Sequence, residues 1–448
     1  MALLNTNRSM TSFGIMWFGQ TISLIGTSMS TFALMIWVWQ QTGQATATVL
    51  TGVSGIIPAL LVGIVAGVLV DRWDRKWVMI VSDLAAGVSS IIILVLFSTN
   101  QLQVWHLYVT AAIDGAAGVF QYLAYSASVS LMIPKAQYAR ASGLQSLSGY
   151  GAKIGAPIIA GILIGVIGIA GILIIDIVTF LFAVGTLLFI HVPNPTGTPQ
   201  TEDTRSSFFQ EATFGFRYLF SHRGLLGLLL ILLAFSTAES LGYPLILPMI
   251  LARTGNNELI LGTVQSVLGI GGVIGAILLT VWGGPRRKVY GVLVGVALTG
   301  LLGDVLMGVG QSLPVWITAA IFLEIFVPVF YGSYQAIWQS KVSPEIQGRV
   351  FAARDLVANI SPPVAMILAA VLSDKVLEPA LMPNGSLAPV LGGLVGTGPG
   401  AGMGLLLVIA GVLSAVAGIS GFAFSAVREV EMRLPDFQET SEVVSEPI

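Results

Sequence analysis

Twelve long apolar runs separated by short polar breaks dominate this 448-residue chain. An α-helix needs about 20 apolar residues to cross the hydrocarbon core of a bilayer, because in lipid the backbone must satisfy its own hydrogen bonds. The sequence therefore predicts an all-α polytopic membrane protein with twelve transmembrane helices. The runs are 13–39, 45–70, 77–97, 104–133, 142–167, 169–190, 224–251, 260–282, 289–309, 314–340, 349–373 and 402–426.

The composition excludes several other classes of protein. Hydrophobic residues make up 55% of the chain and charged residues 9%, whereas about a quarter of a soluble globule is charged. With no cysteine and three scattered histidines, the chain offers no disulfide framework and no spacing typical of a metal site. A net charge of −2 argues against nucleic acid binding, and neither a Walker A sequence nor a Gly-x-Ser-x-Gly elbow is present. We expect no enzyme activity, no cofactor and no metal.

The distribution of basic residues predicts how the chain is oriented. Placing both termini in the cytoplasm puts 17 basic residues on that side, with only Arg253 and Lys375 opposite and Lys153 inside a helix. Cytoplasmic loops of membrane proteins carry an excess of Lys and Arg. The first run is too long for a cleavable signal peptide and should remain as a helix. We therefore expect a multi-pass protein of the plasma (inner) membrane with both termini cytoplasmic.

The fourth run matches the tenth with a constant offset of 210 residues. The offset places acid on acid, aromatic on aromatic and proline on proline: Asp114 on Glu324, Phe120 on Phe330 and Pro134 on Pro344. Two six-helix bundles in a parallel pseudo-repeat account for this pattern. The expected organisation is an N-terminal bundle, a cytoplasmic linker with an amphipathic helix near Ser207–Phe220, a C-terminal bundle and an acidic tail, at 1–191, 192–223, 224–427 and 428–448.

Ionisable residues inside the apolar runs are the strongest functional signal. Such groups are expensive in a membrane unless they are paired or hydrated, and they mark ion and substrate paths. A carboxylate in apolar surroundings binds a proton near neutral pH, which a proton-coupled carrier requires. Asp114, Glu239 and Glu324 are candidates for proton coupling, and Lys153 is either their counter-ion or a substrate contact. For Asp83 and Asp176 we favour structural hydrogen bonds to neighbouring helices, and Asp304 has no assigned role.

Aromatic and small residues offer weaker signals. Aromatic side chains that face a cavity would suit an apolar or cationic substrate, although most aromatics in membrane proteins face lipid or the interface. Glycine-rich stripes in the second, fifth and eighth runs allow close helix contacts, in a carrier or in any other helical bundle. The aromatic candidates for a substrate cavity are Trp17, Phe120, Tyr122, Phe330 and Tyr334.

The segment 67–76, Gly-Val-Leu-Val-Asp-Arg-Trp-Asp-Arg-Lys, resembles the loop signature of the major facilitator superfamily. It lies between the second and third runs, as in that family. Asp74 replaces a glycine of the signature, a variation similar to the macrolide-efflux and siderophore-exporter branch of drug:proton antiporters. The resemblance implies a cytoplasmic gate formed by Gly67, Asp71, Arg72, Arg75 and Lys76, in which Asp71 and Arg75 hold the outward-open state.

Two further segments bear on this resemblance. The counterpart loop at 282–288 keeps three basic residues but lacks the aspartate, so it does not supply a second lock. The fifth run resembles a degraded form of the antiporter signature, with alanines at several glycine positions, which favours export over uptake. Ala111 stands where many drug antiporters carry an arginine in the fourth helix, so coupling through that arginine is not expected.

We therefore predict a monomeric secondary transporter that exports hydrophobic or amphiphilic small molecules, drug- or macrolide-like, by proton antiport with alternating access. Its expected partners are the small-molecule substrate, protons and the lipid bilayer. The alternative within transport is an exporter of a siderophore or an endogenous secondary metabolite. A membrane receptor or scaffold that does not transport is the alternative from another class.

Overall fold

The computed structural model describes residues 2–134, 137–190, 192 and 208–434, with a few side chains in these ranges, including those at 67 and 71, outside the description. These residues form helices and connecting turns without a strand. Most of the linker, at 193–207, and the acidic tail, at 435–448, lie outside the described residues.

The first half of the chain, called the N-half here, contains six spans in five continuous helices. The helix after α4 changes direction at Gly168, where a turn joins two spans. Gly168 has a φ of +67°, a backbone conformation that would be strained in a residue with a side chain. Gly168 is the single residue between the fifth and sixth predicted runs, 142–167 and 169–190. The helices are α1 (Ala2–Thr42), α2 (Ala45–Arg72), α3 (Arg75–Ser98), α4 (Val104–Met132) and α5 (Tyr138–Phe189).

The second half, called the C-half, also contains six spans, but four of them are interrupted. Pro244 and Pro328 lack an N–H and lie where the seventh and tenth spans break into shorter helices. The ninth and eleventh spans contain π-helical segments. In chain order the elements are α7 (Arg223–Gly242), η2 (Tyr243–Leu245), α8 (Ile246–Thr254), α9 (Glu258–Trp282), α10 (Lys288–Leu298), η3 (Thr299–Val305), α11 (Leu306–Val309), α12 (Leu313–Ile325), α13 (Val327–Lys341), α14 (Pro344–Leu372), η4 (Ser373–Leu377), α15 (Glu378–Leu381), α16 (Ala388–Val395) and α17 (Ala401–Ala423).

These helices account for the twelve predicted spans. Ten described helices are long and apolar enough to cross a membrane, and one of them, Gly143–Phe189, contains both the fifth and the sixth span. The remaining span is α4, which is 29 residues long but more polar because it carries Asp114 and Gln121. Most predicted boundaries agree with the helix ends to within about three residues.

Outside the spans, one expectation is confirmed and one is wrong. The linker contains the helix α6 (Phe208–Ser221), close to the predicted amphipathic segment, and it packs on α14, where the Arg349 guanidinium lies 4.7 Å from the centre of the Phe214 ring. The Gly- and Pro-rich composition of the stretch 374–400 predicts an irregular loop. The stretch instead contains the end of η4 and the short helices α15 and α16, because its Gly and Pro residues punctuate helical turns rather than prevent them.

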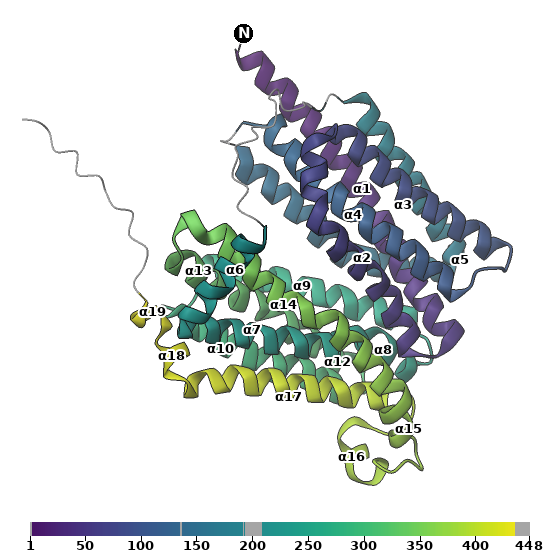
Figure 1. Cartoon of the computed structure of the whole chain (residues 1–448). Helices are drawn as coiled ribbons and strands as arrows, with labels where there is room; N and C mark the ends of the chain where they lie inside the picture. Colours follow the sequence, from purple (N-terminus) through teal and green to yellow (C-terminus); the bar gives the residue numbers. More distant parts are fainter. Residues whose placement is uncertain (1, 135–136, 191, 193–207, 435–448) are drawn as a thin grey trace, which may run out of the picture.

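The two halves meet on one side of the molecule and diverge on the other. We call the side with the start of α1 and with α19 (Val430–Arg433) the termini side, and the opposite side the far side. Figure 1 shows the halves close together where α8 meets the end of α1, and apart toward the termini side. The buried side chains follow the same division.

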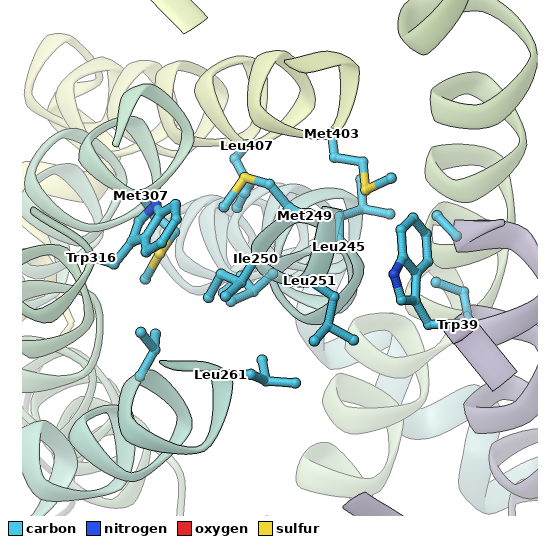
Figure 2. Close-up of a cluster of buried hydrophobic side chains, with 14 of the residues drawn as sticks. Trp39, Leu245, Met249, Ile250, Leu251, Leu261, Met307, Trp316, Met403 and Leu407 are labelled. Atoms are coloured by element: carbon cyan, nitrogen blue, oxygen red, sulfur yellow. The ribbon is translucent and has the colours of Figure 1, made fainter. Parts of the chain in front are cut away.

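On the far side a single hydrophobic cluster includes residues of both halves. Trp39 of α1 packs in the same cluster as Leu245, Met249, Leu251 and Met403 of the C-half (Figure 2). On the termini side the apolar side chains instead form two separate clusters, one confined to the N-half and the other to the C-half. A shared core removes apolar surface from water in both halves at once, so it holds the far side closed.

Equivalent close contacts in the two halves support the repeat. A Cβ on Gly115 of α4 would collide with the carbonyl oxygen of Gly55 in α2. A Cβ on Gly275 of α9 would collide with the carbonyl oxygen of Ile325, the residue that the offset of 210 pairs with Gly115. The second and fourth spans therefore approach each other as the eighth and tenth spans do.

Candidate functional site

The acidic residues of the N-half spans lie next to hydroxyl and amide groups. Asp176 accepts hydrogen bonds from the Thr27 hydroxyl at 3.0 Å and the Ser90 hydroxyl at 2.7 Å. Asp83 accepts one at 2.8 Å from the Gln20 amide. Both contacts join different helices, which agrees with the structural role favoured for these two acids.

Asp114 occupies a less complete environment in α4. It lies beside Ser89 and within electrostatic reach of Asp176, and no donor reaches its buried Oδ1 atom among the described residues. The repeat pairs it with Glu324, but the two lie in different surroundings. Asp114 faces groups of its own half, whereas Glu324 reaches across to the other half.

Glu324 of α12 and Lys153 of α5 form an ion pair between the two halves. The Lys153 Nζ atom lies 2.8 Å from Glu324 Oε1, and the side chains are 42% and 10% exposed. The pair lies beside the close packing of α5 on α9, where the Ser266 hydroxyl donates to the Ile154 carbonyl at 2.6 Å. In this structure Lys153 is paired with Glu324.

Two more carboxyl groups lie behind this pair in the C-half. Glu239 of α7 is within electrostatic reach of Glu324 and within hydrogen-bonding reach of Asp304 of η3. Asp304 is completely buried. Three carboxyl groups from three helices and one lysine from the other half thus form a cluster, called the acidic cluster here. The residues are Lys153, Glu239, Asp304 and Glu324.

A pocket of about 310 Å³ opens between α1, α4 and α5 of the N-half. The candidates Trp17 and Tyr122 both line it, and the Tyr122 side chain is largely exposed. Around them lie amide and hydroxyl groups that can hydrogen-bond to a ligand, from Gln20, Thr21, Gln121, Ser126, Gln145 and Ser148. Among these polar neighbours, the Gln121 amide donates to Gln20 at 2.9 Å. The pocket therefore combines aromatic surfaces with oriented polar groups.

The other three aromatic candidates lie elsewhere. Phe120 stacks on Trp73 and lines a separate groove beside α3. Phe330 and Tyr334 are buried in the C-half cluster on the termini side, where Phe330 contacts the ring of Phe235. The expectation that these three line one substrate cavity with Trp17 is not met in this structure, because their helix faces turn toward neighbouring helices of the same half.

The segment at the α2–α3 connection has a local structural reason for its unusual aspartate. Asp74 is the N-cap of α3, and its side chain accepts a hydrogen bond from the backbone N–H of Trp77 at 3.1 Å. A carboxylate at this position satisfies an unpaired N–H and complements the helix dipole. The acid in place of the signature glycine is therefore compatible with the loop.

The basic residues of this segment contact carbonyls within the N-half. Arg75 is buried and donates to the carbonyl of Ala127 at 2.9 Å, and Lys76 donates to two carbonyls at the end of α5. A cation at a helix C-terminus is favourable. Arg72 is exposed. Gly67 and Asp71 lie on α2, but the position of the Asp71 side chain is outside the description, so the expected Asp71–Arg75 lock stays a prediction.

The counterpart loop of the C-half obtains a carboxylate from the end of the chain. Glu431 of α19 accepts hydrogen bonds at 3.0 Å from the backbone N–H groups of Lys288 and Val289, at the start of α10. Lys341 at the end of α13 donates to the carbonyls of Glu431 and Leu434. A remote segment thus supplies a carboxylate to this loop.

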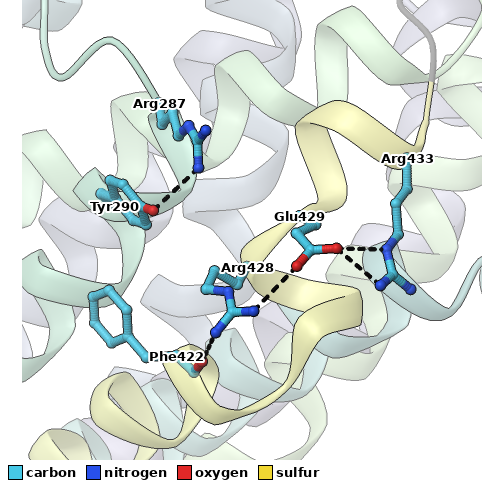
Figure 3. A network of polar contacts seen from close by, with 6 residues as sticks. All are labelled: Arg287, Tyr290, Phe422, Arg428, Glu429 and Arg433. Atoms are coloured by element: carbon cyan, nitrogen blue, oxygen red, sulfur yellow. Dashed lines mark hydrogen bonds and ion pairs between the residues drawn. The ribbon is translucent and has the colours of Figure 1, made fainter.

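Figure 3 shows the polar contacts around this segment. Glu429 pairs with Arg428 at 3.1 Å and with Arg433 at 2.9 Å, and both guanidinium groups keep the pKa of that carboxyl below its usual value. Arg287 of the counterpart loop donates to the Tyr290 hydroxyl at 3.2 Å. These exposed contacts stay within the C-half.

On the far side, a side chain of the C-half caps a helix of the N-half. The two carboxylate oxygens of Asp374 accept hydrogen bonds from the backbone N–H groups of Ala45 at 3.0 Å and Thr46 at 2.7 Å. The N-cap residue of α2, Gln44, makes no side-chain cap of its own. The missing cap is therefore supplied across the boundary between the halves.

Two further hydrogen bonds join the halves beside this cap. The Trp39 indole donates to the Asn256 side chain at 3.0 Å, and the Gln40 amide donates to Glu258 at 2.8 Å. Trp39 also belongs to the shared hydrophobic cluster. Polar and apolar contacts thus close the far side together.

Sequence reasoning identified Glu239, Glu324 and Lys153 individually, but missed how they assemble with Asp304. Depth in the membrane was the available signal, since all four residues fall inside their spans. The cap by Asp374 and the carboxylate of Glu431 had no local signal, because each acts on a backbone more than 100 residues away.

Comparison with known proteins agrees with this geometry. The family model described as Major Facilitator Superfamily matches residues 16–366. The chain is 25% identical over 373 residues to "Macrolide efflux protein A" of Streptococcus pyogenes, covering 81% of this chain and 90% of that protein. It is 25% identical over 321 residues to a protein of the same name from Enterococcus faecalis, covering 70% and 96%.

Solved transporter structures share the fold. A bacterial homologue of the human lysosomal transporter Spinster, described as inward-facing and unoccupied, superimposes with a TM-score of 0.67 at 15% identity, covering 94% of this chain and 97% of that one. An auto-inhibited POT family peptide transporter gives 0.68 at 10% identity, covering 98% and 99%. At these identities the likeness concerns the fold alone.

Proposed function

Because the chain belongs to the major facilitator superfamily, a family of membrane transporters, we propose that it exports hydrophobic or amphiphilic small molecules in exchange for protons by alternating access. The observation that carries the proposal is the Lys153–Glu324 ion pair, which joins the two halves next to further buried carboxyl groups. Protonation of Glu324 and movement of one half against the other both change this ion pair.

The charge of Glu324 determines how strongly it holds Lys153. A protonated Glu324 no longer attracts Lys153, so proton binding weakens a contact that holds α5 to α12. Lys153 is 42% exposed, and water screens part of this attraction. The attraction that remains after this screening favours one arrangement of the halves while Glu324 is ionised. A different arrangement is favoured once Glu324 is protonated. A ligand that binds one state better shifts this equilibrium, and the coupling is reciprocal.

The orientation of the chain in the membrane is inferred from its basic residues. The termini side carries most of the basic residues, so we assign it to the cytoplasm of a plasma membrane, with both termini cytoplasmic. The shared core then closes the external side, and the halves diverge on the cytoplasmic side, where a substrate for export would enter. Since the chain has no cysteine, single introduced cysteines labelled with an impermeant maleimide test this orientation directly.

The nature of the substrate is inferred from the N-half pocket and from the relatives. Aromatic rings and amide groups around a 310 Å³ space suit an apolar molecule that carries hydrogen-bonding groups. The relatives are named for macrolide efflux. We therefore propose a macrolide-like amphiphile as the substrate, and competition by unlabelled siderophores against radiolabelled erythromycin tests the alternative.

The decisive experiment measures erythromycin transport driven by a proton gradient in proteoliposomes. We expect Glu324→Gln to lower gradient-driven transport at least about tenfold, equivalent to about 1.4 kcal/mol of lost coupling, while exchange of labelled for unlabelled substrate persists. Glu429→Gln removes an exposed carboxylate of the termini side as a matched control and should retain gradient-driven transport.

The same assay separates the proposal from its rivals. Unchanged gradient-driven transport in Glu324→Gln, Glu239→Gln and Asp114→Asn together would show that coupling to protons does not use these carboxylates. If the wild-type protein binds erythromycin but transports nothing across the bilayer, a receptor or scaffold is the better description.

A further inference from the structure

Asp304 has no role in the function proposed so far, although its position is unusual. It lies in the π-helical segment η3 of the ninth span, where one turn is wider than in an α-helix. Such insertions occur mostly as single turns and often at functional sites. Asp304 is completely buried, and no amide, hydroxyl or cationic group of the described residues donates to either of its oxygens. An isolated carboxylate ion in this place would be very costly.

The carboxyl group of Glu239 resolves this cost. It approaches Asp304 from α7 within hydrogen-bonding reach, and its own buried Oε1 atom receives no other donor. An ionised carboxylate only accepts hydrogen bonds, so two carboxyl groups can bond to each other only when at least one carries a proton. A shared proton would satisfy the buried oxygens of Asp304 and the Oε1 atom of Glu239 together, and it avoids two negative charges side by side.

No cation of the described residues lies within electrostatic reach of Asp304 or Glu239. Helix α14, which packs on α7 at Ala358 and Ser361, has its arginines nearer the termini side, at 349 and 354. Helix α17 packs on η3 with Gly411 and Ser414 and has no ionisable residue along its length. The ionisable group of α12 is Glu324, which already pairs with Lys153. Tyr243 of η2 and Tyr331 of α13, which lie within electrostatic reach of Glu239, carry no positive charge. One lysine thus faces three carboxyl groups.

We propose that Asp304 and Glu239 form a two-carboxyl site that holds a proton inside the C-half and exchanges it through Glu324 during transport. The proposal rests on the proton-coupled function proposed above. When a proton leaves the pair, an O–H bond of Glu239 or Asp304 breaks and a new O–H bond forms on Glu324. Protonated Glu324 then releases Lys153. Asp304 acts as the internal partner that keeps Glu239 protonated until the transfer.

Infrared difference spectroscopy tests the site without relying on transport. Wild-type protein at neutral pH should show the stretch of a protonated carboxyl group that exchanges with deuterium, and Asp304→Asn should shift or remove this band. Thr299→Val, on the same π-helical segment and without a carboxyl group, is the matched control and should leave the band in place. A wild-type spectrum without a protonated carboxyl band, or a band unchanged in both Asp304→Asn and Glu239→Gln, would overturn the proposal.

A transport measurement shows whether the proton is used. With radiolabelled erythromycin in proteoliposomes, Asp304→Asn should reduce gradient-driven transport to the level of vesicles without a gradient, while exchange persists. Gradient-driven transport at the wild-type level in Asp304→Asn would contradict the exchange step. If the wild-type protein itself shows no proton-driven transport, the proposed function fails, while the infrared band still decides whether the pair holds a proton.

Should Asp304→Asn not insert into the membrane, Glu239→Gln provides the same two measurements from the other side of the pair. Circular dichroism and a monodisperse elution profile establish that each variant is folded.

Discussion

The far side and the termini side of this protein are built from the same helices but are stabilised differently. On the far side, one hydrophobic cluster and four cross-half hydrogen bonds join the N-half to the C-half. On the termini side each half has its own core, the Arg75–Ala127 hydrogen bond lies inside the N-half, and the hydrogen bonds to the Glu431 carboxylate lie inside the C-half. A shared core makes one side a closed contact, whereas separate cores leave the other side free to move.

This difference matches what alternating access requires. A carrier must close one side while the other is open, and the closing contacts must be weak enough to break in each cycle. Hydrogen bonds across an interface contribute about 0.5–1.5 kcal/mol each, so a few of them bias the closed state without making it permanent. The four far-side hydrogen bonds are contacts of this strength. The following substitutions test the contacts between the halves, in order of expected effect.

The largest effect is expected where the halves approach most closely. A Cβ on Gly262 of α9 would lie 2.6 Å from the carbonyl oxygen of Pro157 in α5, so Gly262→Leu forces the two helices apart. Overpacking of this kind costs about 1–3 kcal/mol. We expect a loss of erythromycin transport of at least about fivefold. Gly165→Ala on α5 is the control, because its Cβ meets no atom within 4 Å. Equal activity in both variants would show that close packing of α5 on α9 is dispensable.

Removing the cross-half helix cap should have the next largest effect. Asp374→Asn weakens the capping of α2, because a neutral amide presents only one acceptor oxygen and no charge to the two N–H groups of the helix N-terminus. Loss of such a cap costs about 1 kcal/mol, which shifts the closed far side toward open about fivefold.

A Ser266→Cys reporter in this cysteine-free chain measures the shift as faster labelling from the far side. Lys375→Gln, which changes the next residue along the chain, should leave the labelling rate as it is. Faster labelling in Lys375→Gln but not in Asp374→Asn would contradict the role of the cap.

A smaller change is expected from one neutral hydrogen bond. Trp39→Phe keeps most of the ring in the shared cluster but removes the donor to Asn256, at a cost of about 0.5–1.5 kcal/mol. The same reporter should be labelled faster than in wild type but more slowly than in Asp374→Asn. Trp37→Phe alters a tryptophan that packs inside the N-half and should not change labelling. If Trp39→Phe and Trp37→Phe are labelled at the same rate, the Trp39 hydrogen bond does not help to close the far side.

The smallest effect is expected on the termini side, at the exposed Glu429 network. Arg428 and Arg433 lower the pKa of Glu429, so its stabilising contribution is complete above its ordinary value of about 4.3 and is lost only as the pH falls through the lower folded value. Proteolysis near residue 434 should therefore be constant from neutral pH down to about pH 5. Glu429→Gln should increase it slightly at all these pH values, without changing far-side labelling. A steep change near neutral pH would contradict this account.

Several features of the structure could be predicted from the sequence alone. The spans follow from apolar length, and Gly168, the single residue between the fifth and sixth predicted runs, adopts the positive φ of the turn. The repeat was visible as an offset, because equivalent positions in the two halves face equivalent packing. Asp83 and Asp176 behave as expected because hydroxyl and amide donors are frequent inside helical bundles.

The candidate site was predictable only in part. Lys153, Glu239 and Glu324 stood out as charges in apolar runs, but their spacing in the chain contains no information on which of them meet. The aromatic candidates lie in different places: Trp17 and Tyr122 line a pocket, whereas Phe330 is buried in a core. The sequence could not predict this, because the rotation of each helix about its axis depends on the helices packed against it.

By itself the sequence determined that this chain spans a membrane many times, in which orientation it should insert, and which ionisable groups must be justified there. These properties depend on the transfer of single segments between water and lipid, so local composition settles them. The tertiary structure decided that Asp304 meets Glu239, that Glu324 meets Lys153, and that Asp374 caps a helix of the other half. Those contacts depend on how rigid helices pack across long chain distances, and no local pattern specifies that packing.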